Sequence, residues 1–312
     1  MRKRFFLVLP IILLIVGIGL VVAGSNLAFE KPKDFETTVL CGNTIYSDTI
    51  LTEDLLNCPS NGINIGADNI VFDCRGYTID GDDSGVDYGV YNPGFDNVVV
   101  KNCVVKDFDT GIFYYNPDYN GADNGLIYNN TAYSNQYGIT VYWSANNRVT
   151  NNNASNNVNN GIFLNWFSGS NIVMNNTALS NDVGIMIQDS SENNLTNNII
   201  KSNNRGVYIY SGYSSNNRLI NNIISSNTLT GVRIDFSGNN LLIGNNMTNN
   251  GQWDFTSGGG STNEVINLTT RQNLVSFTGY DISLRVITTG PPDPTDYSNI
   301  SKYLIATNYY GN

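Results

Sequence analysis

A glycine followed by two apolar residues, with a single residue between them, recurs along this chain and constrains its fold more than any other feature. The copies begin at Gly62, Gly111, Gly138, Gly161, Gly184, Gly206 and Gly231, with a weaker copy at Gly89. Successive glycines are 22 to 27 residues apart, whereas the helical repeats of other solenoids are about 33 to 47 residues long. The period therefore predicts a solenoid in which each repeat makes one turn.

Each repeat holds three short apolar segments, which are long enough for β-strands and too short for helices. In one repeat they are Gly111–Tyr114, Asn124–Ile127 and Ala132–Ser134. Parallel strands normally need a long crossover connection, but here each coil returns to pair with the coil before it. The sequence predicts an all-β, single-stranded parallel β-helix of about eight coils over residues 39–268.

Two columns of residues are expected to stabilise this solenoid. The first and third residues after each glycine would form the apolar core, and the glycines would permit backbone angles at the corners. An asparagine also recurs after each second strand, at Asn130, Asn152, Asn176, Asn198, Asn222 and Asn246. Their amides are expected to form a hydrogen-bonded ladder, the alternative being that asparagine is simply favoured in turns.

The two ends of the chain do not follow the period. Residues 1–24 have a basic start and a long apolar run, which predicts a hydrophobic helix that is either a cleaved signal peptide or a membrane anchor. Either alternative predicts an exported protein that is extracellular, on the cell surface or periplasmic. Residues 25–38 are expected to be a linker, and residues 269–312 a C-terminal cap or the start of a further β-rich domain.

All four cysteines lie in the first third of the chain, and an exported protein can oxidise them. Cys41 and Cys58 are predicted to form a disulfide, because the loop between them is short and the bond would tie down an N-terminal cap. The pairing of Cys74 and Cys103 is left open. Without a CxxC motif or a histidine, the cysteines do not indicate a zinc site.

The charge of the chain excludes some classes of function. The net charge is −10 and charged residues make up only 13% of the sequence, so nucleic acid is not an expected partner. The chain has no histidine, which removes the commonest general base and the commonest transition-metal ligand. No cofactor is expected, apart from the calcium alternative considered below, and the oligomeric state is not predicted.

Two segments, Cys41–Ile45 and Ile65–Ile79, followed by coils with tandem asparagines and Gly-Ile pairs, resemble the NosD-type right-handed β-helix repeat proteins. The resemblance covers about residues 39–268. It implies a right-handed helix, a location in the cell envelope, and a family name that speaks of periplasmic copper binding or sugar-related domains. Copper is not expected here, because the chain lacks histidine and its methionines Met174, Met186 and Met247 are dispersed.

Large aromatic residues recur at the second and fourth positions after the repeat glycines, which point away from the core. This outward set, with two tryptophans just beyond it, is Phe113, Tyr115, Tyr142, Trp143, Phe163, Trp166, Tyr208 and Tyr210. Stacked about 4.8 Å apart, the rings would form a ribbon suited to the sugar rings of a glycan. The protein is thus predicted to be a scaffold or a carbohydrate-binding module. The alternatives are that the rings merely cover one another in a structural surface protein, or that they contact another protein.

Acidic residues offer two further candidate sites. Asp80, Asp82 and Asp87 lie in one loop with the spacing of calcium ligands, although the expected glutamate at the twelfth position is missing. Asp189, Glu192 and Asp235 are the candidates if the protein is a polysaccharide lyase or glycoside hydrolase, which would need two carboxylates close together.

Seven Asn-x-Ser/Thr sequons permit glycosylation. They begin at Asn129, Asn153, Asn175, Asn194, Asn246, Asn267 and Asn299.

Overall fold

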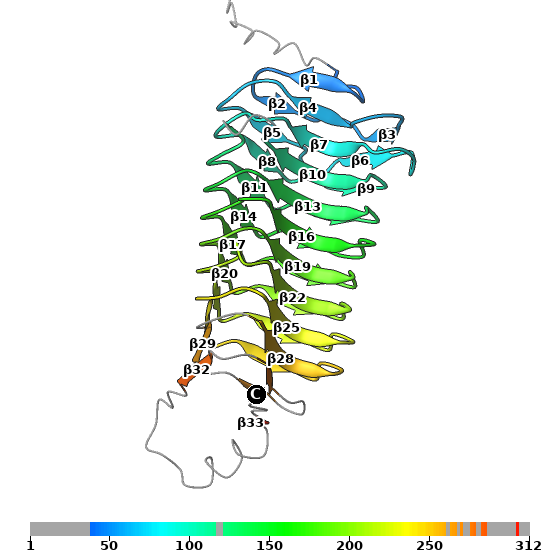
Figure 1. Ribbon diagram of the computed structural model, residues 1–312. Coiled ribbons are helices and arrows are strands. Elements are labelled where there is room, and N and C mark those ends of the chain that lie inside the picture. Colours follow the sequence, from blue (N-terminus) through cyan, green and yellow to red (C-terminus); the bar gives the residue numbers. More distant parts are fainter. Residues whose placement is uncertain are drawn as a thin grey trace, which may run out of the picture. The chain divides into compact units, whose positions relative to one another are not determined.

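The computed structural model describes residues 38–116, 121–259 and 263–266, together with the strand positions at 269–270, 275–278, 282–285 and 304–305. These residues form a right-handed parallel β-helix of about nine turns (Figure 1). The predicted fold class is therefore confirmed. The expected N-terminal hydrophobic segment lies outside the described residues. Among the described residues, no helix is both long and apolar enough to cross a bilayer.

The first sheet contains the strands that carry the glycine motif, in a twelve-stranded parallel order. Its strands are β1 (Asn43–Ile45), β4 (Ile63–Ile65), β7 (Tyr88–Asn92), β10 (Thr110–Tyr115), β13 (Tyr137–Tyr142), β16 (Asn160–Asn165), β19 (Val183–Gln188), β22 (Arg205–Tyr210), β25 (Thr230–Asp235), β28 (Trp253–Gly258), β31 (Val275–Thr278) and β33 (Leu304–Ile305).

The second sheet has eleven parallel strands, one from each successive coil. They are β2 (Thr49–Ile50), β5 (Val71–Asp73), β8 (Val99–Lys101), β11 (Leu126–Tyr128), β14 (Arg148–Thr150), β17 (Ile172–Met174), β20 (Asn194–Thr196), β23 (Arg218–Ile220), β26 (Leu241–Ile243), β29 (Asn263–Ile266) and β32 (Ile282–Arg285).

The third sheet has ten parallel strands and closes each coil. They are β3 (Leu55–Cys58), β6 (Thr78–Gly81), β9 (Val104–Lys106), β12 (Thr131–Tyr133), β15 (Asn153–Ala154), β18 (Thr177–Leu179), β21 (Ile199–Lys201), β24 (Ile223–Ser225), β27 (Asn246–Thr248) and β30 (Thr269–Thr270). Because β30 to β33 pair within the three sheets, the sheets extend beyond residue 268.

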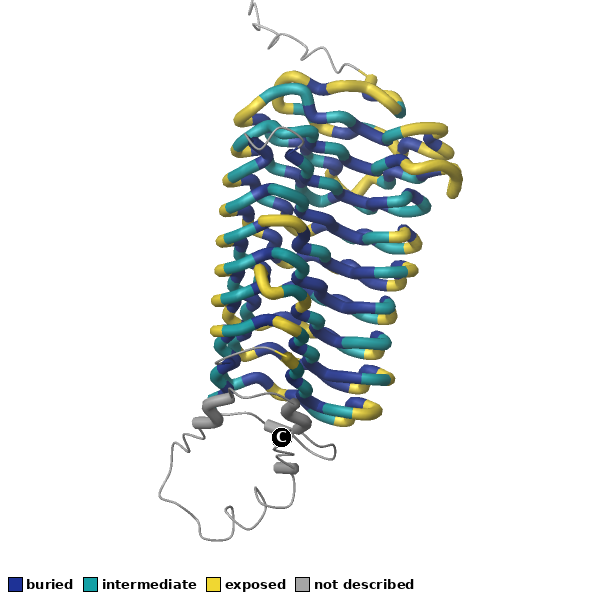
Figure 2. The backbone as a smooth tube through the Cα atoms, viewed as in Figure 1, coloured by how far each residue is buried: buried dark blue, intermediate teal, exposed yellow. Residues whose placement is uncertain are grey.

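The core is a continuous apolar column inside the three sheets (Figure 2). In the first sheet the first and third residues after each glycine are fully buried, as in Ile162 and Leu164 of β16. Most strands of the other two sheets whose burial is described add one or two buried side chains, such as Val173 of β17 and Ala178 of β18. The alternation of inward and outward residues is the period of two that the sequence predicts.

The repeat glycines have a different role from the one expected. They do not adopt positive φ angles, which here belong mainly to asparagine and serine at the corners. A Cβ atom on Gly161 would instead lie 2.7 Å from the carbonyl oxygen of Gly184 on the next coil, and the same clash recurs at Gly138 and Gly206. Glycine is therefore needed for the close approach of successive coils.

Three corners of the coil each carry a column of buried asparagines, where the sequence indicated one. The predicted column is real but ends at Asn245 and not at Asn246, whose side chain is exposed on β27. Asn176 shows the pattern: its Nδ2 donates to Asn198 Oδ1 at 3.0 Å and to the Val149 carbonyl at 2.8 Å. Its Oδ1 accepts the backbone N–H of Asn152 at 2.9 Å.

Of the other two columns, one follows the third sheet and the other precedes the second sheet. They contain Asn135, Asn157, Asn181, Asn203, Asn227 and Asn250, and Asn147, Asn171, Asn193, Asn217, Asn240 and Asn263. The residue before each rung has a positive φ, such as 57° at Asn175. This explains the tandem asparagines, because the first supplies the left-handed turn and the second the ladder.

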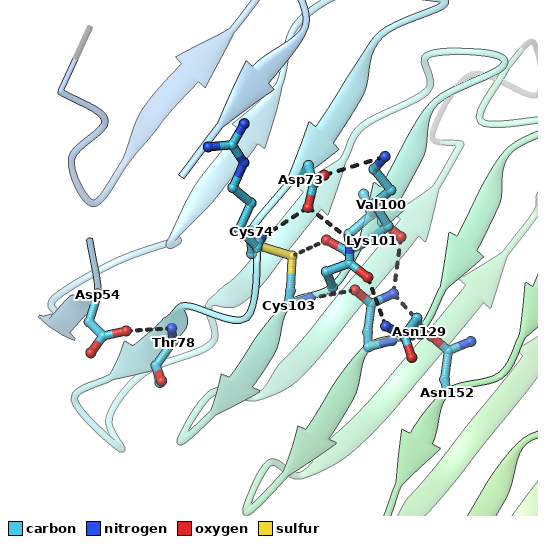
Figure 3. The surroundings of a disulfide bond; sticks show 12 residues. Asp54, Asp73, Cys74, Thr78, Val100, Lys101, Cys103, Asn129 and Asn152 are labelled. Atoms are coloured by element: carbon cyan, nitrogen blue, oxygen red, sulfur yellow. Dashed lines mark hydrogen bonds and ion pairs between the residues drawn. A yellow bond between two sulfur atoms is a disulfide. The ribbon is translucent and has the colours of Figure 1, made fainter. Parts of the chain in front are cut away.

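Two disulfides strengthen the first coils. Cys41 is bonded to Cys58, as predicted, and Cys74 is bonded to Cys103. The Cys103 backbone N–H donates to Asn130 Oδ1 at 2.9 Å, so Cys103 stands where later coils have an asparagine rung (Figure 3). The second disulfide thus replaces a ladder contact with a covalent one.

Candidate functional site

The outer side of the first sheet carries a continuous array of aromatic rings. In-register pairing places Tyr91 beside Phe113 and Tyr115 beside Tyr142 on neighbouring strands. The ring centroids of Tyr88 and Phe113 are 4.8 Å apart, and those of Tyr115 and Tyr142 are 5.4 Å apart. We call these outward rings the aromatic face: Tyr88, Tyr91, Phe113, Tyr115, Tyr137, Tyr142, Phe163, Tyr208 and Tyr210.

The eight aromatics singled out in the sequence fall into separate groups. Phe113, Tyr115, Tyr142, Trp143 and Trp166 form one unbroken series of ring contacts. Tyr208 and Tyr210 form a second pair, with centroids 5.8 Å apart, and Phe163 packs on Tyr137. Met186 and Gln188 of β19 occupy the outward positions between the first two groups.

Trp143 and Trp166 do not lie on strands but on the turn that leaves the first sheet. They share this turn with three rings that the sequence interpretation missed, and we call the five the aromatic corner: Trp143, Trp166, Phe167, Tyr213 and Phe236. The series continues here, because Trp166 contacts Phe167 at 6.4 Å and Phe167 contacts Tyr213 at 5.9 Å between centroids. The rings of Phe167, Tyr213 and Phe236 are 58%, 68% and 61% exposed.

A buried serine follows the aromatic corner in the five coils from β13 to β25: Ser144, Ser168, Ser190, Ser214 and Ser237. Backbone N–H groups donate to the serine hydroxyl of the next coil, from Ser144 to Ser168 at 3.3 Å and from Ser168 to Ser190 at 3.2 Å. The spacing from the repeat glycine to this serine is six residues at Gly138 but seven at Gly161 and eight at Gly206. These variable spacings are the signal that would have revealed Phe167 and Tyr213.

A charged cluster surrounds Tyr208 towards the C-terminal part of the aromatic face. The Tyr208 hydroxyl donates to Asp235 at 3.0 Å, and the guanidinium carbons of Arg205 and Arg233 lie 5.8 and 5.4 Å from its ring centre. Burial, with the hydrogen bond to Asp235, raises the pKa of Tyr208 to about 12. Tyr208 is therefore protonated at neutral pH and donates its hydroxyl hydrogen to Asp235.

The three candidate catalytic carboxylates have separate partners. Asp189 accepts a hydrogen bond from the Ser211 hydroxyl, and Glu192 accepts one from Ser170 at 3.3 Å on the exposed surface. Asp235 binds Arg233 Nε at 2.5 Å as well as Tyr208. Each of the three carboxylates thus has its own local hydrogen-bond partners.

The acidic loop does not bring its candidate calcium ligands together. Asp80 forms an ion pair with Lys106 at 2.7 Å, and Asp82 caps its own turn by accepting the Ser84 N–H at 3.1 Å. Burial, and then the charge of Asp82, raises the pKa of the buried Asp87. Within the described residues, no group of three acidic or cysteine side chains is placed to hold a metal ion.

Asp109 lies one coil beyond Asp87, directly before β10, at the edge of the aromatic face. Burial raises the pKa of its carboxyl group. Burial, followed by the charge of Asp109, also raises the pKa of Tyr88. This edge of the aromatic face is therefore acidic.

Five of the seven sequons are in the described residues. Asn129, Asn153, Asn175 and Asn246 are exposed and Asn194 is half-buried. Asn267 and Asn299 lie outside the described residues.

Comparison with known proteins gives a family and a fold. The family model described as "Right handed beta helix region" matches residues 88–247 and 184–283. No curated protein has a sequence that matches this chain.

Solved structures with the same fold share little sequence with the chain. The A-module of the Azotobacter vinelandii mannuronan C-5 epimerase AlgE4 has a TM-score of 0.58 at 15% identity, covering 79% of this chain and 83% of its own. The AlgE6 A-module from the same organism has a TM-score of 0.51 at 14% identity, covering 80% and 81%. The Dettilon tailspike protein gp208 has a TM-score of 0.51 at 15% identity, covering 75% and 61%.

Proposed function

We propose, for a chain that belongs to the right-handed β-helix family, that it is an exported carbohydrate-binding protein whose ligand lies on the aromatic face. The observation that carries this proposal is the series of stacked, half-exposed rings from Tyr88 to Trp166. Aromatic rings on a rigid platform stack on the apolar faces of sugar rings, and in-register coils repeat that platform along the solenoid.

Two observations support the proposal further. Solved structures of similar fold include modules named as epimerases of mannuronan, which is a polysaccharide. Export is supported by the two disulfides, which form in oxidising compartments. A location on the cell surface or in the periplasm, with the N-terminal segment as a signal or an anchor, is part of the proposal.

Catalysis is the weaker candidate, because the groups that would perform it are engaged elsewhere. A glycosidase needs two carboxylates about 5 to 10 Å apart, with one held as an acid. Asp189 and Asp235 instead accept hydrogen bonds from Ser211 and from Tyr208 with Arg233.

A glycan array with the purified full-length protein tests the proposal, followed by product analysis on each glycan that binds. We expect binding without new reducing ends or unsaturated products. Phe113→Ala should weaken binding at least tenfold. Tyr128→Ala is the matched control, since Tyr128 is an exposed ring on the outer side of the second sheet, and should bind as the unmodified protein does. Cleavage of a bound glycan would contradict the proposal, as would the absence of binding to any glycan.

A further inference from the structure

The aromatic corner holds large rings in a backbone conformation that disfavours them. Phe167 and Phe236 both have φ angles of 56°, and Trp143 and Trp166 have 51° and 45°. Left-handed backbone is adopted readily by glycine and asparagine and is strained for bulky residues. At the other two corners the same conformation is taken mainly by asparagine and serine, such as Asn197 and Ser202.

Packing within the protein does not account for these rings. Phe236 is 61% exposed and its ring contact is with Tyr210, at 6.1 Å between centroids. Phe167 is 58% exposed, and its ring contacts the rings of Trp166 and Tyr213 at the surface. Strained residues that gain little from burial are typical of binding sites, where a ligand contact favours them.

The variable length of the turn that leaves the first sheet also indicates a binding surface. From Asn147 to Asn152 and from Asn171 to Asn176 the rungs keep a spacing of five residues, but the turn from the first sheet lengthens in the coils of β16 and β22. In solenoids, insertions in single repeats map to one face, often the binding face. The longer turns carry Phe167 and Tyr213, whose rings meet across the coil of β19.

The aromatic corner is continuous with the aromatic face. Trp143 lies against Tyr115 at 6.4 Å, and Trp166 lies against Tyr142 at 6.5 Å between centroids. The two surfaces therefore offer rings at an angle to one another, one set on the strands and the other on the turn. Between them, the outward amide of Gln188 can donate and accept hydrogen bonds with sugar hydroxyls.

The charges around these rings disfavour an acidic glycan. Arg205 and Arg233 are the basic side chains of the aromatic face, and each faces a carboxylate, Asp182 at 3.8 Å and Asp235 at 2.5 Å. Asp189 lies on the corner turn between Phe167 and Tyr213. With a net charge of −10 for the chain, a polyuronate would meet repulsion, whereas an uncharged sugar would not.

We propose that the aromatic corner is the part of the site that grips the glycan, and that it selects uncharged sugar rings. The inference rests on the proposed function, since it assigns the residues and the sugar class of that same site. Phe167 and Phe236 are binding residues kept at some loss of folding stability, and the aromatic face is the platform beside them.

Affinity electrophoresis of the full-length protein tests this in gels that contain neutral glucan, mannan or xylan, or the polyuronates alginate or polygalacturonate. We expect retardation by at least one neutral polymer and by neither polyuronate. Phe167→Asn and Phe236→Asn should each weaken binding at least tenfold while leaving the melting temperature within about 2 °C, because asparagine suits the left-handed turn. Ser202→Asn, at the same conformation on another corner, is the matched control and should bind normally.

The outcomes separate the two proposals. Normal binding by both phenylalanine variants, with loss of binding in Phe113→Ala, would overturn the inference and leave the proposed function standing. Retardation by polyuronates alone, or a fall of more than about 5 °C in the melting temperature of both variants, would also overturn it. If neither these gels nor the glycan array detects binding, the proposed function itself fails.

Discussion

The two asparagine corners that follow the second and third sheets contrast with the connection from the first to the second sheet, which begins at the aromatic corner and ends at the third asparagine column. At these two asparagine corners an exposed residue with a positive φ precedes a buried amide, and each rung from Asn130 to Asn222 and from Asn135 to Asn227 donates to the rung of the next coil. At the aromatic corner the residues with positive φ are Trp143, Trp166, Phe167 and Phe236, with Asp189 and Ser211 at this position in the other two coils. The rung here is a serine, and its spacing from the repeat glycine varies. The difference indicates that the two asparagine corners serve stacking, whereas the first part of the remaining connection presents a surface.

Deletion of Asn175 should have the largest effect on this comparison. The deletion shortens a corner of fixed length and turns every following side chain of that coil to the opposite side, so that Val173 and Ala178 can no longer both face the core. We expect loss of the cooperative unfolding transition, measured by circular dichroism against temperature. A variant that still melts cooperatively near the original temperature would show that the asparagine corners tolerate changes in length.

Asn176→Ala should destabilise the protein by about 3 kcal/mol or more, because it leaves the Val149 carbonyl and the Asn152 N–H buried without partners. Urea denaturation measures the loss. Asn197→Ala is the matched control at an exposed turn position with φ 56°, and should cost only about 1 kcal/mol from backbone strain. Equal losses would mean that asparagine acts here only as a turn residue and not as a ladder.

The bridge between Cys74 and Cys103 closes a loop with a sequence separation of 29 residues. Replacing both cysteines by serine should cost about 3 to 4 kcal/mol in urea denaturation. The pair Cys74→Ser and Cys103→Asn should recover about 1 kcal/mol of this, since asparagine can extend the ladder from Asn130 by one rung. If the free energy of unfolding is the same for both double variants, the ladder does not extend beyond Asn130.

Asp87→Asn should raise the stability at neutral pH. Burial and the charge of Asp82 raise the pKa of Asp87 above its ordinary value of 3.8, so the folded state binds this proton more tightly than the unfolded chain does. Stability therefore falls as the pH rises from about 3.8 through the raised folded value. At pH 7 the melting temperature of the variant, measured by calorimetry, should be about 1 to 3 °C above that of the unmodified protein. Near pH 3 the two melting temperatures should be equal. A lower melting temperature at pH 7 would contradict this.

Deletion of Phe167 should have the smallest effect on stability. It gives the coil of β16 the same glycine-to-serine spacing as its neighbours at Gly138 and Gly184, so the serine column stays in register. The melting temperature should remain within about 2 °C of the unmodified protein. Beside the deletion of Asn175, this result would separate a corner that is free to vary from one that is not.

Much of the fold was predictable because a solenoid repeats its constraints within about two dozen residues. The glycine period, the inward columns and one asparagine ladder follow from local patterns. The predicted ladder is wrong by one residue in its last coil. Gly244 takes the left-handed position there, so the rung is Asn245 and not Asn246. The predicted outward aromatics include those at the periodic positions up to Tyr210 and the two tryptophans just beyond the strands, whereas Phe167 and Tyr213 lie outside the periodic positions.

The sequence by itself determined the period, the alternation of strands and the kind of residue at each corner, because backbone geometry and burial act over a few neighbouring residues. Only the tertiary structure decided what those residues meet. The repeat glycines allow the next coil to pack closely, and Cys74 forms a disulfide with Cys103. The ring of Phe167 contacts that of Tyr213, although a whole coil separates them in the sequence. Such contacts depend on how coils of unequal length stack, which no single repeat specifies.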